Sequence, residues 1–249
     1  MSDPIIDSTI ANGFHIDPNT NAATLSKEEK ARFALSVNPS FRKIDLGSPR
    51  ILAPATALFT TSQLLTSEEC DEWIKRAQTT GLETGDFIFK TGEKGYEKMT
   101  TGGRRFSSTT VVSDDESSFN RQVYEILLKD GIVPTTLADG AEVFAGIRNN
   151  FLLSRYEPHQ YFAPHFDGQQ KLEDGSGVSH YTAVLYLSDD FTGGETLYLS
   201  SPEDVAGLTK EDPMWSDIPE NIAISPKRGH AVVHKQGTVL HAGAEVLSG

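Results

Sequence analysis

The segment Arg155-Tyr-Glu-Pro-His-Gln-Tyr-Phe-Ala-Pro-His165-Phe-Asp167-Gly168 decides how the chain is interpreted. Its second half has the residue pattern of a strand, in which residues i and i+2 project from the same face. His165 and Asp167 are therefore expected side by side. An imidazole beside a carboxylate supplies two of the three ligands of a facial 2-His-1-carboxylate iron site. The pattern predicts a metal site that needs a second histidine, and His241 is the leading candidate.

A His-x-Asp pair is weak evidence by itself, and the chain contains another copy. His15-Ile16-Asp17 is followed by polar, turn-forming residues and has no strand pattern beside it. We interpret that copy as a solvated loop. Two other histidines, His230 and His234, could also supply the third ligand, and His234 is the second choice after His241.

Length and charge limit the classes of protein to consider. With 249 residues the chain can form one large domain, or a domain with an extension. A net charge of −13 argues against nucleic acid and anionic membrane as partners, since both favour a basic surface. The single cysteine, Cys70, excludes an internal disulfide and a cysteine-built metal site.

The N-terminal sequence has neither the basic segment nor the sustained apolar run of a signal peptide. No stretch of the sequence has the length and apolar composition of a membrane span. An intracellular setting is therefore expected, in the cytoplasm, with the nucleus as an open alternative. The oligomeric state is not determined by these features.

The chain is predicted to consist of an N-terminal extension, residues 1–54, and one domain, residues 55–249. The role of the extension is open, and a short helix is expected in it at 26–35. Helices are also predicted from the capping-box pair Thr66 and Glu69 to about residue 79, and over about 117–129. The polar, glycine-rich stretch 81–103 is interpreted as a mobile loop.

After Gly146 the sequence changes to short strands separated by turn residues. The predicted strands are 150–156, 161–166, 181–188, 195–200, 222–225, 230–234 and 239–242. Short strands at this spacing are typical of a β-sandwich or barrel. Because the helices precede them, the predicted class is α+β.

Several motifs occur in order along this β-rich half. They are Arg155-Tyr-Glu-Pro158, Pro164-His-Phe-Asp-Gly168, Val184-Leu-Tyr-Leu-Ser188, Gly193-Gly-Glu-Thr196, Pro226-Lys-Arg-Gly229 and Leu240-His-Ala-Gly243. With these motifs, residues 55–249 resemble the prolyl 4-hydroxylase-like branch of the Fe(II)- and 2-oxoglutarate-dependent dioxygenases. The resemblance implies a double-stranded β-helix, a jelly-roll barrel with helices packed outside, which agrees with the strand pattern.

The resemblance also implies the site and its chemistry. His165, Asp167 and His241 would bind Fe(II), with no catalytic residue beyond these ligands. 2-Oxoglutarate would be the co-substrate, and ascorbate is left open as a further cofactor. The implied reaction hydroxylates an unactivated C–H bond of a protein side chain, prolyl among the candidates, or of a small molecule, and releases succinate and CO2. The substrate itself is not determined.

Three hydroxyl side chains are candidates for binding 2-oxoglutarate by this resemblance. Tyr156 stands nine residues before His165, where the family often has a tyrosine that reaches the co-substrate. Tyr186 and Thr196 could hydrogen-bond the C5 carboxylate, although packing within the sheet is an equal alternative for both. The family tends to place substrate contacts in the region of 81–103 and Arg104-Arg105.

One family feature has no counterpart in the sequence. The family binds the C5 carboxylate through a Lys or Arg about nine or ten residues after the distal histidine. The chain reaches Gly249 before that position. We therefore expect the last barrel strand to be missing, the chain to be truncated at its C-terminus, and 2-oxoglutarate to bind weakly.

Two alternative functions stay open on the sequence alone. A catalytically degenerate jelly-roll binding module would explain the absent cation, although an intact set of ligands argues against it. A zinc hydrolase could use the same His-x-Asp pair, but it needs a general base near the metal, for which Glu195 is the only tempting residue.

Overall fold

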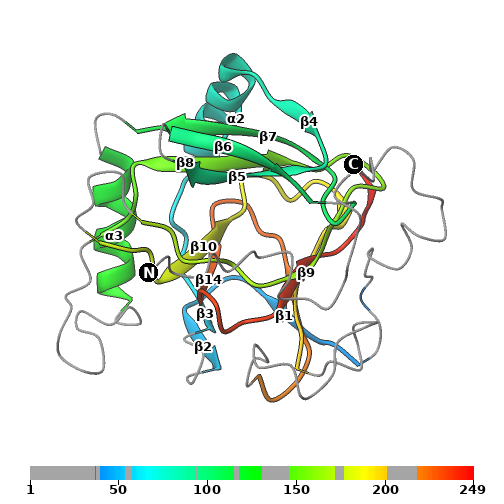
Figure 1. Ribbon diagram of the computed structural model, residues 1–249. Coiled ribbons are helices and arrows are strands. Elements are labelled where there is room, and N and C mark those ends of the chain that lie inside the picture. Colours follow the sequence, from blue (N-terminus) through cyan, green and yellow to red (C-terminus); the bar gives the residue numbers. More distant parts are fainter. Residues whose placement is uncertain are drawn as a thin grey trace, which may run out of the picture.

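The computed structural model describes residues 37, 40–53, 58–92, 95–101, 103–114, 118–130, 146–171, 177–200 and 218–249. Within these ranges most elements are strands, and the two helices are α2 (Ser67–Thr80) and α3 (Ser118–Lys129). Figure 1 shows both helices on the outside of the strands. The α+β class is confirmed. The expected helix at 26–35 and the pair His15 and Asp17 lie outside the described residues.

Two sheets form the body of the domain. The five-stranded sheet has the order β1-β13-β12-β15-β9, and the four-stranded sheet has the order β10-β14-β3-β2. The pairs within both sheets are antiparallel, except for the parallel pair β1–β13. The strands of the first sheet are β1 (Arg42–Asp45), β13 (Ile222–Ser225), β12 (Thr196–Tyr198), β15 (His241–Gly243) and β9 (Phe162–His165). Those of the second are β10 (Tyr181–Leu185), β14 (Ala231–Lys235), β3 (Leu58–Thr60) and β2 (Arg50–Ala53).

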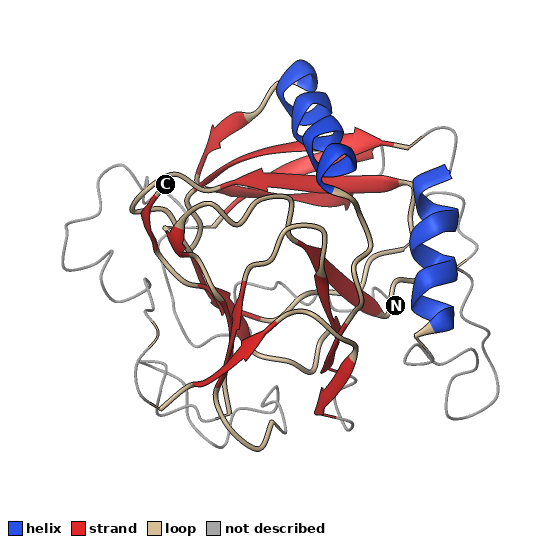
Figure 2. Ribbon diagram, turned by 180° about the vertical axis from the view of Figure 1, so that it is seen from behind, coloured by secondary structure: helices blue, strands red, loops and turns tan. Residues whose placement is uncertain are grey.

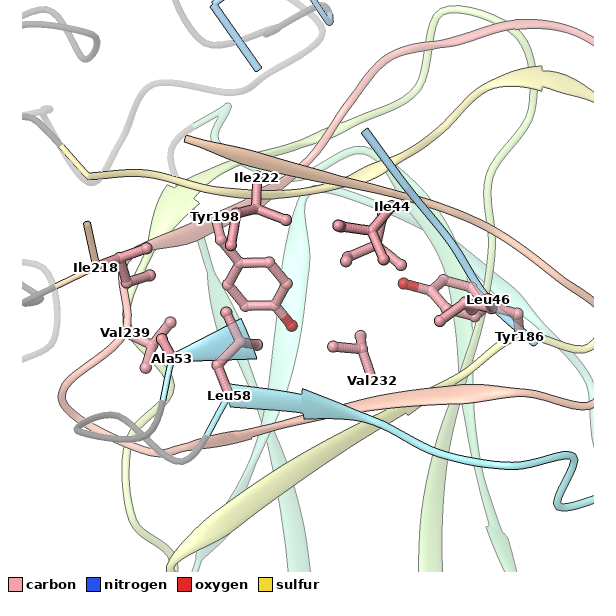
Figure 3. Packing of buried hydrophobic residues seen from close by; sticks show 11 residues of the cluster. Ile44, Leu46, Ala53, Leu58, Tyr186, Tyr198, Ile218, Ile222, Val232 and Val239 are labelled. Carbon is pink, nitrogen blue, oxygen red and sulfur yellow. The ribbon is translucent and has the colours of Figure 1, made fainter. Parts of the chain in front are cut away.

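Side chains from both sheets meet in one apolar core (Figure 3). Ile44 and Ile222 from the first sheet pack in the same cluster as Leu58 and Val232 from the second. Burying each such side chain contributes about 1.5–3 kcal/mol to stability. This shared apolar core therefore holds the two sheets face to face. Two sheets enclosing a core are the arrangement of a jelly roll. A short pair, β11 (Thr192–Gly193) with β16 (Val246–Ser248), lies beside them.

Helix α2 begins at the predicted capping box. The Thr66 side chain accepts a hydrogen bond from the Glu69 backbone N–H at 3.2 Å, and the Glu69 carboxylate accepts one from the Thr66 N–H at 2.8 Å. These bonds satisfy two donors that every helix N-terminus leaves free. The sequence therefore predicted the start of this helix correctly.

A third sheet, β4-β7-β8, lies under α2 (Figures 1 and 2). Its strands are β4 (Glu83–Gly85), β7 (Ser107–Ser113) and β8 (Asn150–Arg155). Trp73 and Ala77 on the buried face of α2 pack against Val112 of β7 and Leu153 of β8. The helix therefore covers this sheet with its buried apolar face.

The interpretation of 81–103 as a mobile loop is wrong. Most of this stretch forms β4 and the hairpin of β5 (Phe87–Gly92) and β6 (Gly95–Thr100). The rings of Phe87 and Phe89 pack edge to face at 5.4 Å, and Lys98 forms an ion pair with Glu83. The polar composition concealed these strands because the pairing of β5 with β6 and the Lys98–Glu83 ion pair join residues on different strands.

Two strands lie before the expected boundary at 54/55. β1 pairs with β13, and β2 pairs with β3. The two main sheets therefore begin N-terminally of residue 55. Neither described helix has the length and apolar composition needed to cross a membrane.

Candidate metal centre

The two predicted histidines meet because their strands are neighbours in the five-stranded sheet. β9 and β15 pair antiparallel, and the register sets His165 directly opposite His241. Their ring centroids lie 4.2 Å apart. Asp167 follows β9 by two residues, and its backbone carbonyl accepts a hydrogen bond from the Gly237 N–H at 2.8 Å, which ties this segment to the turn before β15.

The three predicted ligands form one compact cluster. The His165 Nε2 lies 3.5 Å from the Asp167 Oδ1, and the His241 Nε2 lies 3.6 Å from the Asp167 Oδ2. One ligand atom from each side chain lies within 4.8 Å of the other two. Two imidazoles and one carboxylate on one side of an ion leave its other coordination positions for exogenous ligands.

Hydrogen bonds at the far side of each ring determine which nitrogen is free. The Nδ1 of His165 lies 2.8 Å from the Ala163 carbonyl oxygen, and the Nδ1 of His241 lies 3.0 Å from that of Val239. A carbonyl can only accept, so each Nδ1 carries the proton and each Nε2 presents a lone pair. Such a bond at the second nitrogen is typical of metal-ligating histidines.

The electrostatics of the cluster favour the protonation states that a metal requires. Burial alone would raise the pKa of the Asp167 carboxyl, but the neighbouring His241, His165 and His234 hold that pKa well below its usual range. Burial lowers the pKa of the His241 imidazole well below its usual range, and the nearby His165 and His234 add to this shift. The residues thus offer an ionised carboxylate and a neutral imidazole at neutral pH, which fit Fe(II).

Two of the three hydroxyl candidates for 2-oxoglutarate binding touch each other. The Tyr186 hydroxyl lies 2.7 Å from the Thr196 Oγ1, and both side chains are buried. Figure 3 shows the Tyr186 hydroxyl inside the core. Thr196 and Tyr198 are two residues apart on β12 and so share a face. Because Tyr198 lies opposite His241 in the sheet, the hydroxyl pair is on the same side as the cluster.

The third candidate, Tyr156, approaches the cluster only through other side chains. Its ring centroid lies 6.0 Å from the guanidinium carbon of Arg105. That carbon lies 4.7 Å from the ring centroid of Phe162, and the Phe162 ring stacks on His165 at 3.7 Å. Arg105 belongs to the predicted substrate-contact segment. The Phe162 ring therefore contacts both Arg105 and His165.

The sequence left His230 and His234 open as alternative third ligands, and the structure places them differently. His234, the second choice as a ligand, is fully buried, and its Nε2 lies 3.2 Å from the Asp167 Oδ2. The role of its neighbour Tyr198 was not predicted. The alternation along β14 was the available signal, because His234 shares a face with the core residue Val232. Among the described residues, the ligand cluster includes neither His230 nor Glu195, the base that a zinc hydrolase would need.

Comparisons with known proteins agree on one family. The family model of the 2OG-Fe(II) oxygenase superfamily matches residues 151–249. The chain is 24% identical over 204 residues to a probable prolyl 4-hydroxylase 8 of Arabidopsis thaliana, covering 77% of this chain and 64% of the relative. It is 26% identical over 232 residues to prolyl 4-hydroxylase 1 of the same plant, covering 88% and 74%. The chain thus spans less than two thirds of the first relative's length.

Solved structures were compared as well. A Pseudomonas putida prolyl-4-hydroxylase aligns with a TM-score of 0.47 at 14% identity, covering 77% of this chain and 87% of the other. A 2OG-Fe(II) oxygenase family oxidoreductase from Burkholderia pseudomallei aligns with a TM-score of 0.49 at 8% identity, covering 84% and 90%.

Proposed function

We propose that this chain is a prolyl 4-hydroxylase-like member of the 2OG-Fe(II) oxygenase superfamily and that it acts as a 2-oxoglutarate-dependent dioxygenase. It would hydroxylate an unactivated C–H bond of a protein side chain, prolyl among the candidates, or of a small molecule. The observation that carries the proposal is the cluster of His165, Asp167 and His241, with both histidine Nδ1 atoms bound to backbone carbonyls.

In this proposal the chain's residues bind and orient Fe(II) and 2-oxoglutarate, and these two supply the oxidising chemistry. Bound Fe(II) together with 2-oxoglutarate would supply the oxidising chemistry, with release of succinate and CO2. His165, Asp167 and His241 would hold the metal at one end of the core. Tyr186, Thr196 and Tyr156 would bind 2-oxoglutarate. Each hydroxyl has one proton to donate, so a carboxylate lying beside the pair would accept from both once they give up their mutual hydrogen bond, which suits the terminal group of the co-substrate.

The first test needs no substrate. The anaerobic chain is titrated with Fe(II) and then with 2-oxoglutarate, and the weak visible metal-to-ligand charge-transfer band is recorded. We expect the band in the parent chain and its loss in His165→Ala, because chelation of 2-oxoglutarate needs the metal in its triad. Asp190→Ala, in an exposed loop, is the control and should keep the band.

Each other outcome has a distinct meaning. A chain that binds Fe(II) but gives no band has no working 2-oxoglutarate site, and the proposed activity fails. A chain that does not bind Fe(II) is better described as a jelly-roll binding module. Where the band forms, succinate release with a proline-rich peptide, with and without ascorbate, tests the prolyl substrate and the further cofactor.

We also propose that Arg105 contributes to substrate binding. The side chain is buried, and its Nε has no hydrogen-bond partner among the described residues. A substrate carbonyl or carboxylate that reached this nitrogen would form a charge-assisted bond one ring away from His165. The Nη2 already donates to the Ser154 hydroxyl, which holds the guanidinium in place.

Arg105→Ala should therefore lower hydroxylation of the peptide about tenfold or more while leaving the charge-transfer band intact. The control is Arg155→Ala, which removes an exposed arginine whose partner is Glu157. Peptide-dependent succinate release measures the effect. Equal turnover in the two variants would show that Arg105 has only a structural role.

A further inference from the structure

A third imidazole contacts the carboxylate of the cluster from the opposite sheet. His234 lies on β14, whereas His165 and His241 lie on β9 and β15. Its side chain is fully buried, and its Nε2 lies 3.2 Å from the Asp167 Oδ2. Its ring centroid lies 4.3 Å from that of His241. Asp167 is therefore in contact with both sheets, and the question is whether His234 is a ligand or a hydrogen-bond donor.

The partner of the second ring nitrogen answers this question. The Nδ1 of His234 lies 3.0 Å from the Tyr198 hydroxyl. Tyr198 is fully buried, and Figure 3 shows its hydroxyl pointing into the core. A phenol keeps its proton at neutral pH, so the Tyr198 hydroxyl has one hydrogen bond to donate. A buried hydroxyl donates to an acceptor within reach, and His234 Nδ1 is the one that the described residues offer.

The resulting tautomer separates His234 from the two predicted ligands. Because Nδ1 accepts from Tyr198, the proton of the neutral ring is on Nε2, which faces Asp167. In His165 and His241 the arrangement is reversed, since their Nδ1 atoms face carbonyls and their Nε2 atoms have the lone pairs. Three histidines surround one carboxylate, but only two of them are set to bind a metal.

We propose that His234 is a positioning residue, which receives a hydrogen bond from Tyr198 and donates one to Asp167 to hold that carboxylate for the metal. This inference rests on the proposed function, because it concerns the same metal site. A bond from β14 limits rotation of the Asp167 side chain, which otherwise lies in the segment after β9. Loss of such a partner typically lowers metal affinity 10- to 100-fold.

The test is an anaerobic titration of the metal-free chain with Co(II), followed by visible absorption. His234→Phe keeps a flat ring of similar size but removes the donor. His234→Gln returns an N–H at a similar distance from the backbone. Tyr198→Phe removes only the first hydrogen bond. The matched control is His230→Phe, since His230 is also buried but has its Nδ1 on the Arg228 carbonyl, away from the cluster.

We expect His234→Phe to bind Co(II) about 10- to 100-fold more weakly than the parent while remaining folded by circular dichroism. His234→Gln should recover most of the affinity with the parental band shape, and Tyr198→Phe should show a smaller loss. His230→Phe should bind like the parent. Recovery by glutamine is the result that a purely structural role would not give.

Two results would overturn the inference. Equal Co(II) affinity in parent and His234→Phe would show that Asp167 needs no support from β14. A changed band in His234→Gln, without recovery of affinity, would make His234 a direct ligand. The proposed function fails separately, because in that case the parent chain itself would not bind the metal.

Discussion

His241→Ala is expected to eliminate measurable Fe(II) binding and to lower 2-oxoglutarate turnover about 1,000-fold or more, which corresponds to a loss of about 4 kcal/mol of transition-state stabilisation. The imidazole is one of the three groups that converge, and its Nε2 is the lone pair that β15 contributes. A methyl group leaves Asp167 and His165 as the only predicted ligands. Two ligands do not make the facial set.

His230→Ala is a close control for this variant. Both histidines are 5% exposed, and each has its Nδ1 near the carbonyl oxygen of the residue two positions before it, at 3.0 Å for His241 and 3.1 Å for His230. Both variants should therefore lose similar stability in a thermal melt. Only His241→Ala should lose Fe(II) binding and succinate release. Parental metal affinity in His241→Ala would refute the assignment of the distal ligand.

Gly229→Ala is expected to destabilise the fold by about 4 kcal/mol or more, in contrast to about 1–2 kcal/mol for Gly237→Ala. Both glycines have a positive φ, +78° and +74°, which an alanine adopts only with strain. At Gly229 an added Cβ would also lie 2.1 Å from the Leu65 carbonyl oxygen, whereas nothing lies within 4 Å at Gly237. The clash is with backbone, so no side chain can move aside.

The close approach at Gly229 has a structural purpose. Its carbonyl accepts hydrogen bonds from the Leu64 and Leu65 N–H groups at 2.7 and 3.1 Å, and its own N–H donates to the Tyr186 carbonyl. The turn thus joins the segment before α2 to the end of β10. Urea unfolding followed by circular dichroism measures both variants. Equal losses would mean that the backbone at Leu65 can shift to admit the methyl group.

Local rules accounted for much of the fold and for the candidate ligands. The capping box at Thr66 is a contact between residues three positions apart, so the pattern in the sequence predicts it. The period of two along a strand predicted that His165 and Asp167 lie side by side, which is confirmed, although the strand itself ends at His165. The hairpin of β5 and β6 was missed because its stabilising contacts run between strands.

Contacts between strands that are distant in the sequence followed from the tertiary structure. The sequence alone predicted that His165 and Asp167 lie side by side, and they do, although Asp167 lies two residues beyond the end of β9 and not on the strand. It also predicted His241 as the distal ligand from its residue context. Only the fold set His241 opposite His165, since the register of β9 and β15 is defined by their pairing. Only the packing of the two sheets brought His234 of β14 to both Asp167 and Tyr198. Hydrogen bonds across sheets follow from the position of whole strands, which no short pattern of residues specifies.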